Sequence, residues 1–184
     1  VAMEYITKPL LLRQRRFDMR FVTLLRSAQP AEMYVYDVFW TRLAHHPADQ
    51  HNNYTNKQSS FTAMHLINES VLDSSYPDYL SVITELEETY NIEWKVDILP
   101  KIHALLKEAF FHITSKPPMK CSNSRAIYGC DIMMDELQPK LLEVTFMPAN
   151  NAVMPCFEKT YESYVNDVFG CLFLGETNNV TRLL

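Results

Sequence analysis

Residues 126–146 read AIYGCDIMMDELQPKLLEVTF and carry the clearest strand pattern in this chain. It contains two runs rich in β-forming residues, 126–135 and 140–146, and a short turn through Leu137 and Pro139 separates them. Two such runs with so short a connection predict an antiparallel hairpin.

The register of the hairpin follows from its turn. A turn centred on Leu137 pairs residues that lie at equal distances from it, and successive pairs alternate between the two faces, so the odd-numbered pairs share one face of the sheet. The expected pairs are Asp131 with Glu143, Met133 with Leu141, and Gly129 with Thr145. The other face is apolar and is expected to be buried in the core; it carries Ile132, Met134, Leu142, Val144 and Phe146.

The pairing of Asp131 with Glu143 raises an electrostatic question. Carboxylates at directly opposed positions have Cβ atoms about 4.5–5.5 Å apart, and like charges at that distance are destabilising unless a positive charge lies between them. A Mg²⁺ ion is one candidate, since it commonly binds one or two carboxylates together with nucleotide phosphates. Pairing with Arg125 or Lys140 is another, and a register shifted by one residue is a third. The spacing alone leaves these alternatives open.

Upstream of the hairpin, residues 16–21 alternate polar and apolar side chains, which predicts a strand with two different faces. Arg16, Asp18 and Arg20 are expected on one face, and the intervening apolar residues on the other. A turn at residues 28–30 leads to an aromatic and β-branched run at 33–40. We therefore expect a second antiparallel pair of strands.

Helical spacing of apolar residues predicts three helices. The first follows Pro77 and runs to about Tyr90, the second covers 99–113, and the last covers 157–172. Residues 44–60 have no apolar period and are expected to form a loop that includes His45, His46 and His51. A solvated loop is favoured there over a metal site.

Composition limits the possible classes of protein. The 184 residues are 47% hydrophobic and 21% charged, which fits one globular domain or a large piece of one. A net charge of −5 argues against general nucleic-acid binding. However, the first 26 residues hold six basic and two acidic side chains, so they carry +4 and the remaining 158 residues carry −9. This basic strip suits an anionic ligand or an acidic peptide.

Several sites and locations are disfavoured. Three glycines in the whole chain are too few for a Gly-rich phosphate loop. Cysteine spacing lacks the paired pattern of a zinc site, so free thiols are expected at Cys121, Cys130, Cys156 and Cys171. The apolar runs fall far short of the roughly 20 residues that span a bilayer, and no secretory leader opens the chain. We expect a cytoplasmic protein without a membrane partner.

Three motifs, in chain order, resemble those of one family. They are MEYITKPLL at residues 3–11, RFDMR at 16–20, and GCD at 129–131 together with LLEV at 141–144. In this order they resemble the hinge, the central strand and the metal-binding hairpin of tubulin-tyrosine ligases and their relatives. The resemblance covers essentially the whole chain.

The resemblance implies an α/β fold of the ATP-grasp type (α+β, with a mostly antiparallel sheet and flanking helices), of which residues 1–184 form the carboxy-terminal half. It implies a ligase that uses ATP and Mg²⁺ to activate a carboxylate, with tubulin as the protein partner and a cytoplasmic, cytoskeleton-associated location. The implied roles are adenine contact by the backbone of Glu4, Tyr5 and Ile6, nucleotide contact by Arg16 and Asp18, acceptor contact by Arg20, and Mg²⁺ binding by Asp131, Glu143 and Thr145.

The chain departs from the family pattern at several of these positions. The hinge Gln is Met3, the strand Lys is Arg16, and the metal-binding Asn is Thr145. A threonine hydroxyl reaches less far than an amide carbonyl, so metal binding is expected to weaken. The acceptor-seating segment corresponds to residues 60–63 and keeps only Thr62. These changes predict a degenerate ligase site that works more by binding than by catalysis. The alternative is an active amino-acid ligase in the full-length form.

Overall fold

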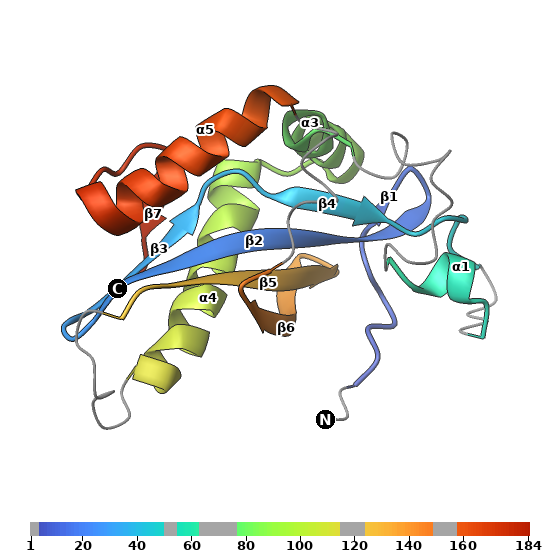
Figure 1. The fold of residues 1–184 in the computed structure, drawn as a ribbon. Helices are drawn as coiled ribbons and strands as arrows, with labels where there is room; N and C mark the ends of the chain where they lie inside the picture. The colour runs from blue at the N-terminus through green and yellow to red at the C-terminus, as the bar shows by residue number, and fades with distance from the viewer. Residues whose placement is uncertain (1–3, 50–54, 63–76, 115–123, 149–157) are drawn as a thin grey trace.

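The computed structural model describes residues 4–49, 55–62, 77–114, 124–148 and 158–184. Figure 1 shows an antiparallel sheet flanked by helices. The strands are β1 (Leu11–Leu12), β2 (Arg15–Ala28), β3 (Ala31–Tyr36), β4 (Trp40–Leu43), β5 (Ala126–Asp135), β6 (Gln138–Phe146) and β7 (Val180–Arg182). The helices are α1 (Lys57–Ser60), α3 (Tyr79–Tyr90), α4 (Leu99–Thr114) and α5 (Glu158–Phe169), with π-helical segments η3 (Trp94–Ile98) and η5 (Gly170–Leu174).

Strand β2 is the centre of the sheet. Its neighbours follow the order β6-β5-β2-β3-β7, and β1 and β4 also pair with β2. Every pairing of named strands in the described residues is antiparallel. The predicted α+β class, with a mostly antiparallel sheet and flanking helices, is thereby confirmed.

The predicted single strand at 33–40 is in fact two strands, β3 and β4. Thr23 pairs with Val35 on β3, whereas Arg20 pairs with Trp40 on β4, so the partner strand carries two residues more than β2 between these pairs. Phe39, in this excess, stacks on Phe21 with ring centroids 5.1 Å apart. Because an excess of two residues preserves the alternation of faces, β3 and β4 keep the same sides toward the two layers.

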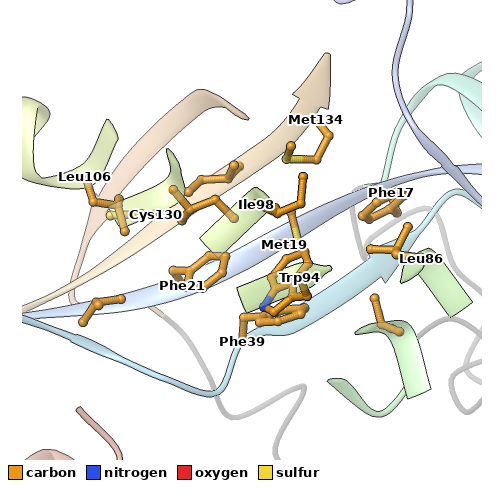
Figure 2. Packing of buried hydrophobic residues seen from close by; sticks show 14 of the residues in the cluster. Phe17, Met19, Phe21, Phe39, Leu86, Trp94, Ile98, Leu106, Cys130 and Met134 are labelled. Atoms are coloured by element: carbon orange, nitrogen blue, oxygen red, sulfur yellow. The ribbon is translucent and has the colours of Figure 1, made fainter. Parts of the chain in front are cut away.

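Two apolar clusters cover the two faces of the sheet. Figure 2 shows the larger cluster, where Phe17, Met19 and Phe21 of β2 meet helical residues such as Trp94 and Leu106. The smaller cluster joins α5 and η5 to the opposite face. It comprises Val22, Leu24, Tyr34, Tyr36, Trp40, Tyr164, Val168, Cys171, Leu172 and Val180. The sheet therefore lies between α3, η3 and α4 on one side and α5 with η5 on the other.

The helix boundaries match the sequence signals closely. Helix α3 begins after the predicted Pro77, with the Asp78 carboxylate accepting a 2.9 Å hydrogen bond from the backbone N–H of Ser81. It ends at Asn91, whose φ of 50° is the left-handed conformation that asparagine tolerates. The second predicted helix is α4, and it is extended at its start by η3. The last is α5, followed by η5.

The predicted loop at 44–60 contains the short helix α1 within its described part. None of the helices in the described residues combines the length and apolar character that crossing a membrane requires. Two of the four cysteines, Cys130 and Cys171, are buried free thiols as expected, and Cys121 and Cys156 lie outside the described residues.

Helix α3 offers a matched pair of leucines that tests this packing. Leu86 is 1% exposed in the larger cluster, and Leu80 on the same helix is 58% exposed. We expect Leu86→Ala to lower the free energy of unfolding by about 2–5 kcal/mol, because it removes buried apolar contacts and leaves a cavity. Leu80→Ala should change it by no more than about 0.5 kcal/mol. Urea unfolding of both variants measures the difference, and equal losses would contradict the assigned face of α3.

Candidate functional site

Strand β2 carries the candidate site on the face opposite the larger cluster. Its odd-numbered apolar residues, Phe17, Met19 and Phe21, are fully buried in that cluster. On the other face Val22 and Leu24 pack under α5 and η5, whereas Asp18 and Arg20 make polar contacts. One strand face is thus apolar at its carboxy-terminal half and polar at its amino-terminal half.

Five charged side chains form a row across four neighbouring strands, which we call the charged row. It runs from Arg42 on β4 through Asp18 and Arg20 on β2 to Asp131 on β5 and Glu143 on β6. Arg42 and Asp18 are directly opposed in the register, as are Arg20 and Asp131, and Asp131 and Glu143. The backbone pairing therefore brings all five side chains to one place.

Asp131 is held by both arginines of the row. Arg20 donates to both of its carboxylate oxygens, from Nε at 2.7 Å and from Nη2 at 2.8 Å. Arg42 donates from Nη2 at 2.6 Å, and its Nε donates to Asp18 at 2.7 Å. Bidentate and charge-assisted bonds of this kind are the stronger hydrogen bonds in proteins. The two arginines together supply the positive charge that the opposed carboxylates require.

Glu143 stands at the exposed end of the row. Its Oε1 lies 3.6 Å from Nη2 of Arg20, and its side chain is 59% exposed, compared with 4% for Asp131. The Thr145 hydroxyl donates to Oε1 of Glu143 at 3.2 Å. Neither Arg125 nor Lys140 takes the predicted place between the acids, since Arg125 donates to the Leu172 carbonyl and Lys140 lies 3.9 Å from Asp135.

Burial and ion pairing act against each other on the pKa values of the row. Burial raises the pKa of the Asp18 carboxyl to about 6, although Arg42 and the Thr62 hydroxyl both favour its charged form. Burial also disfavours the charged form of Asp131, but the hydrogen bonds from Arg20 and Arg42 outweigh it and hold the pKa below its ordinary value. The pKa of Arg42 is raised, because Asp18 and Asp131 together outweigh its burial. Asp131 is accordingly a firmly ionised carboxylate.

Thr62 closes one side of the row. Its hydroxyl donates to Oδ2 of Asp18, and the preceding helix α1 is held by a 2.9 Å bond from the backbone N–H of His46 to the carbonyl of Gln58. The sequence singled out Thr62 as the residue retained in the acceptor-seating segment. The structure brings Thr62 to the predicted site, and Ala63 lies outside the described residues.

A cavity of about 290 Å³ adjoins the row and is lined by the predicted hinge. Its walls are Glu4, Tyr5, Ile6, Arg16, Ser60, Phe61, Thr62, Met133 and Leu142. Nη1 of Arg16 donates to the Ile6 carbonyl at 3.2 Å, and its guanidinium lies 5.2 Å from the centre of the Tyr5 ring. A second cavity of about 270 Å³ shares Glu4, Tyr5, Ile6 and Leu142. The predicted hinge, Arg16 and the hairpin thus meet around one hollow.

The hinge is fixed beside the hairpin by backbone contacts. The N–H of Leu10 donates to the Met134 carbonyl at 3.1 Å, and the N–H of Glu136 donates to the Lys8 carbonyl at 2.8 Å. Pro9 forms an isolated antiparallel bridge with Asp135. The chain that leaves Ile6 therefore runs along the turn end of the hairpin, which explains how residues so far apart in sequence share a cavity.

The predicted hairpin register holds on one side of a bulge and fails on the other. Asp131 pairs with Glu143 and Gly129 with Thr145, as predicted. After Asp131 the register shifts, so Met133 lies opposite Lys140 and the predicted pair of Met133 with Leu141 is wrong. Because Leu142 is the additional residue at this β-bulge, it lines the two cavities instead of the core.

The predicted burial of the hairpin's apolar face is correct for only part of it. Ile132 and Met134 on β5 are buried in the larger cluster. On β6, Val144 is 37% exposed and Phe146 is 62% exposed, contrary to the prediction. Val144 and Phe146 are more exposed because β6 is an edge strand of the described sheet, whereas β5 lies inside it. The alternation identified the faces but not how far the core extends.

Arg42 is the member of the charged row that the sequence did not predict. Arg42 follows the aromatic run 33–40, which predicted a single strand. Because two additional residues lie between β3 and β4, the pairing of Arg42 with Asp18 could not be derived from that run. Its position in the strand could have indicated its direction. Arg42 lies two residues after Trp40 and therefore on the same face of β4, just as Asp18 and Arg20 share one face of β2. His45 and His46, by contrast, stack with ring centroids 4.8 Å apart, and His51 lies outside the described residues.

The residues of the row fit a divalent cation in one respect. Asp131 and Glu143 offer carboxylate oxygens at directly opposed positions, which is the hard oxygen donor set that Mg²⁺ prefers. Within the described ranges, no group of three or more His, Cys, Asp or Glu side chains could hold a metal by itself. Thr145 is close enough to Glu143 to add an oxygen. A cation at these residues would depend on two carboxylates and would meet the guanidinium of Arg20.

Comparison with known proteins gives a consistent result. The tubulin-tyrosine ligase family model matches residues 1–180. Tubulin--tyrosine ligase-like protein 12 of Mus musculus is 33% identical over 207 aligned residues, which cover 100% of this chain and 31% of that protein. The Homo sapiens protein of the same name is 31% identical over 195 residues, covering 96% of this chain and 29% of that protein.

A more distant relative, tubulin glycylase 3E of Tetrahymena thermophila, is 28% identical over 167 residues, covering 81% of this chain and 12% of that protein. The chain thus spans less than a third of the length of each of these relatives. The match to the family model covers almost all of the chain, and it includes the hinge, the central strand and the hairpin that carried the resemblance. On this evidence the chain belongs to the tubulin-tyrosine ligase family.

Proposed function

We propose that this chain forms one wall of a nucleotide-binding cleft in a tubulin-tyrosine ligase-like protein whose ligase site is degenerate. In this proposal the protein influences tubulin modification more by binding than by catalysis, and it works in the cytoplasm, where tubulin is found. The single observation that carries the proposal is the state of Asp131. Three guanidinium N–H groups of Arg20 and Arg42 hold this proposed metal ligand at 2.6–2.8 Å.

The hinge cavity supports the nucleotide part of the proposal. Apolar side chains of Ile6, Met133 and Leu142 line it, and the Arg16 guanidinium lies at its wall. An apolar hollow with a few polar groups is the usual form of a small-molecule site. We propose that a purine base lies against the backbone of 4–6, with Arg16 and Asp18 closer to the ribose and phosphates.

The proposed roles of the charged row follow from its geometry. Asp131 and Glu143 would hold Mg²⁺, which would supply charge neutralisation for a transferring phosphoryl group. Thr145 replaces the family's asparagine, and its hydroxyl already donates to Glu143. Arg20, which the resemblance assigns to contact with the acceptor peptide, and Arg42 both donate to Asp131 in this row. The shortage of strong metal ligands favours binding over catalysis.

The second candidate function is an ATP-dependent amino-acid ligase that acts on tubulin tails in the full-length form. Its support is that residues 4–6 line a cavity together with Thr62, and that Thr62 donates to Asp18 in the charged row. The same row holds Arg20 and the opposed pair of Asp131 and Glu143. The names of the relatives, which include tubulin glycylase 3E and a probable tubulin polyglutamylase of Homo sapiens, agree with tubulin as the protein partner. The two candidates differ in how well the site binds Mg²⁺ with nucleotide.

The cavity makes a direct prediction for nucleotide binding. Leu142→Trp places a bulky side chain in the hinge cavity and should weaken binding of a fluorescent ATP analogue by about tenfold or more, equivalent to about 1.4 kcal/mol. Val144→Trp is the matched control, since Val144 lies on the same strand but does not line the cavity. Fluorescence anisotropy titrations of both purified variants give the affinities. Equal affinities would place the nucleotide elsewhere.

Thr145 separates the two candidate functions. Thr145→Asn restores an amide carbonyl and should strengthen the Mg²⁺-dependent part of ATP binding by about fivefold, because the longer side chain reaches a cation beside Glu143. Isothermal titration with and without Mg²⁺ measures this part. Thr181→Asn on β7 is the control for the same substitution far from the cleft. If binding is already tight and Thr145→Asn leaves it unchanged, the ligase candidate is favoured instead.

We further expect purified residues 1–184 to add no amino acid to tubulin. The resemblance implies that residues 1–184 form only the carboxy-terminal half of an ATP-grasp domain, and the chain spans about 30% of the tubulin--tyrosine ligase-like relatives. An assay with radiolabelled tyrosine, glutamate and glycine tests this, with tubulin glycylase 3E as the positive control for glycine. Any ATP-dependent incorporation above background would show that this half of the fold is sufficient.

A further inference from the structure

Arg20 occupies the place between the two proposed metal ligands. Its guanidinium forms a bidentate pair with Asp131 at 2.7 and 2.8 Å, and its Nη2 lies 3.6 Å from Glu143. A cation that bridged these two carboxylates would need the same oxygens. Arg20 and a bridging cation therefore exclude one another at this position.

The other arginine of the row is anchored differently. Arg42 donates to Asp18 as well as to Asp131, and the side chain of Asp18 is only 1% exposed. A cation at Asp131 would therefore leave Arg42 with a buried partner. The second carboxylate near Arg20 is the exposed Glu143. Arg20 is accordingly the arginine that a cation can displace.

We propose that Arg20 is the resident counter-ion of the Asp131–Glu143 pair and that a divalent cation binds by exchanging with it. Cation entry releases the Arg20 guanidinium from Asp131, so that it can receive an anionic group such as a phosphate or a carboxylate. This inference rests on the proposed nucleotide-binding function, since it assigns the cation to the same carboxylates. It gives Arg20 a positioning role that the family resemblance does not supply.

The charge balance shows why the exchange would matter. Asp18, Asp131 and Glu143 face Arg20 and Arg42, so the row carries one net negative charge in this state. Addition of a divalent cation changes that charge to one net positive. Anions are repelled before the exchange and attracted after it. Binding of the cation and of the anionic ligand should therefore be cooperative, and cooperativity of binding is reciprocal.

The exchange is tested with Mn²⁺ alone, without nucleotide. Free Mn²⁺ is counted by electron paramagnetic resonance during titration of the purified protein. Arg20→Gln removes the competing cation and should raise Mn²⁺ affinity about fivefold or more. Arg26→Gln is the matched control, because Arg26 lies on the same strand and pairs with Glu32 away from the cleft, and it should leave the affinity within about twofold.

Nuclear magnetic resonance of the unsubstituted protein gives a second readout. The Nε–H of Arg20 donates to Asp131, so its signal should move when Mg²⁺ displaces it, while that of Arg26 stays in place. The signal is assigned by its absence from the spectrum of Arg20→Lys. If circular dichroism shows that Arg20→Gln does not fold, Arg20→Lys, which keeps the positive charge, is the second variant. Glu143→Gln should abolish or strongly weaken the Mn²⁺ binding.

The proposal is overturned if Arg20→Gln binds Mn²⁺ no more tightly than the unsubstituted protein, if neither protein binds Mn²⁺, or if the Arg20 signal does not respond. These outcomes are independent of nucleotide binding, which the anisotropy titrations measure without reference to Arg20. A protein that binds nucleotide but shows no exchange would refute only the present inference. Exchange without nucleotide binding would refute the proposed function and leave the counter-ion role in place.

Discussion

Hydrogen bonding of β2 along both of its edges fixes which way its side chains point. β5 bonds to one edge, and β3 and β4 share the other. A strand held on both edges cannot slip by one residue without moving every side chain to the opposite face. Phe17, Met19 and Phe21 would then leave the larger cluster, at a cost of about 1.5–3 kcal/mol for each buried side chain. The apolar residues thus fix the direction of Asp18 and Arg20, although they do not touch a ligand.

Burying several charges at one site is costly unless each has a partner. The charged row meets this condition because the least exposed acids, Asp18 and Asp131, both pair with Arg42, and Asp131 also pairs with Arg20. The row is therefore a stable part of the fold as well as a candidate site.

The sequence predicted those parts that depend on local periodicity. The hairpin, the pairing of Asp131 with Glu143, the alternation of β2 and the positions of α3 and α4 all follow from side-chain spacing. The bulge at Leu142 and the excess between β3 and β4 could not be predicted, because both depend on how distant segments meet. Arg42 was missed for the same reason, since its partners are 24 and 89 positions away in the chain. Periodicity determines faces, but only tertiary pairing determines neighbours.

The division of β2 into an apolar and a polar face has a consequence for descent within the family. Substitutions at 17, 19 and 21 act mainly through core packing. Substitutions at 18 and 20 act through the charge balance of the row and through the chemistry that the protein performs. The two kinds of selection act on alternate residues of one strand and interfere little with each other. Catalysis can therefore be lost, or replaced by recognition, while the architecture is inherited unchanged. A fold of this kind can be retained after its original reaction has been lost.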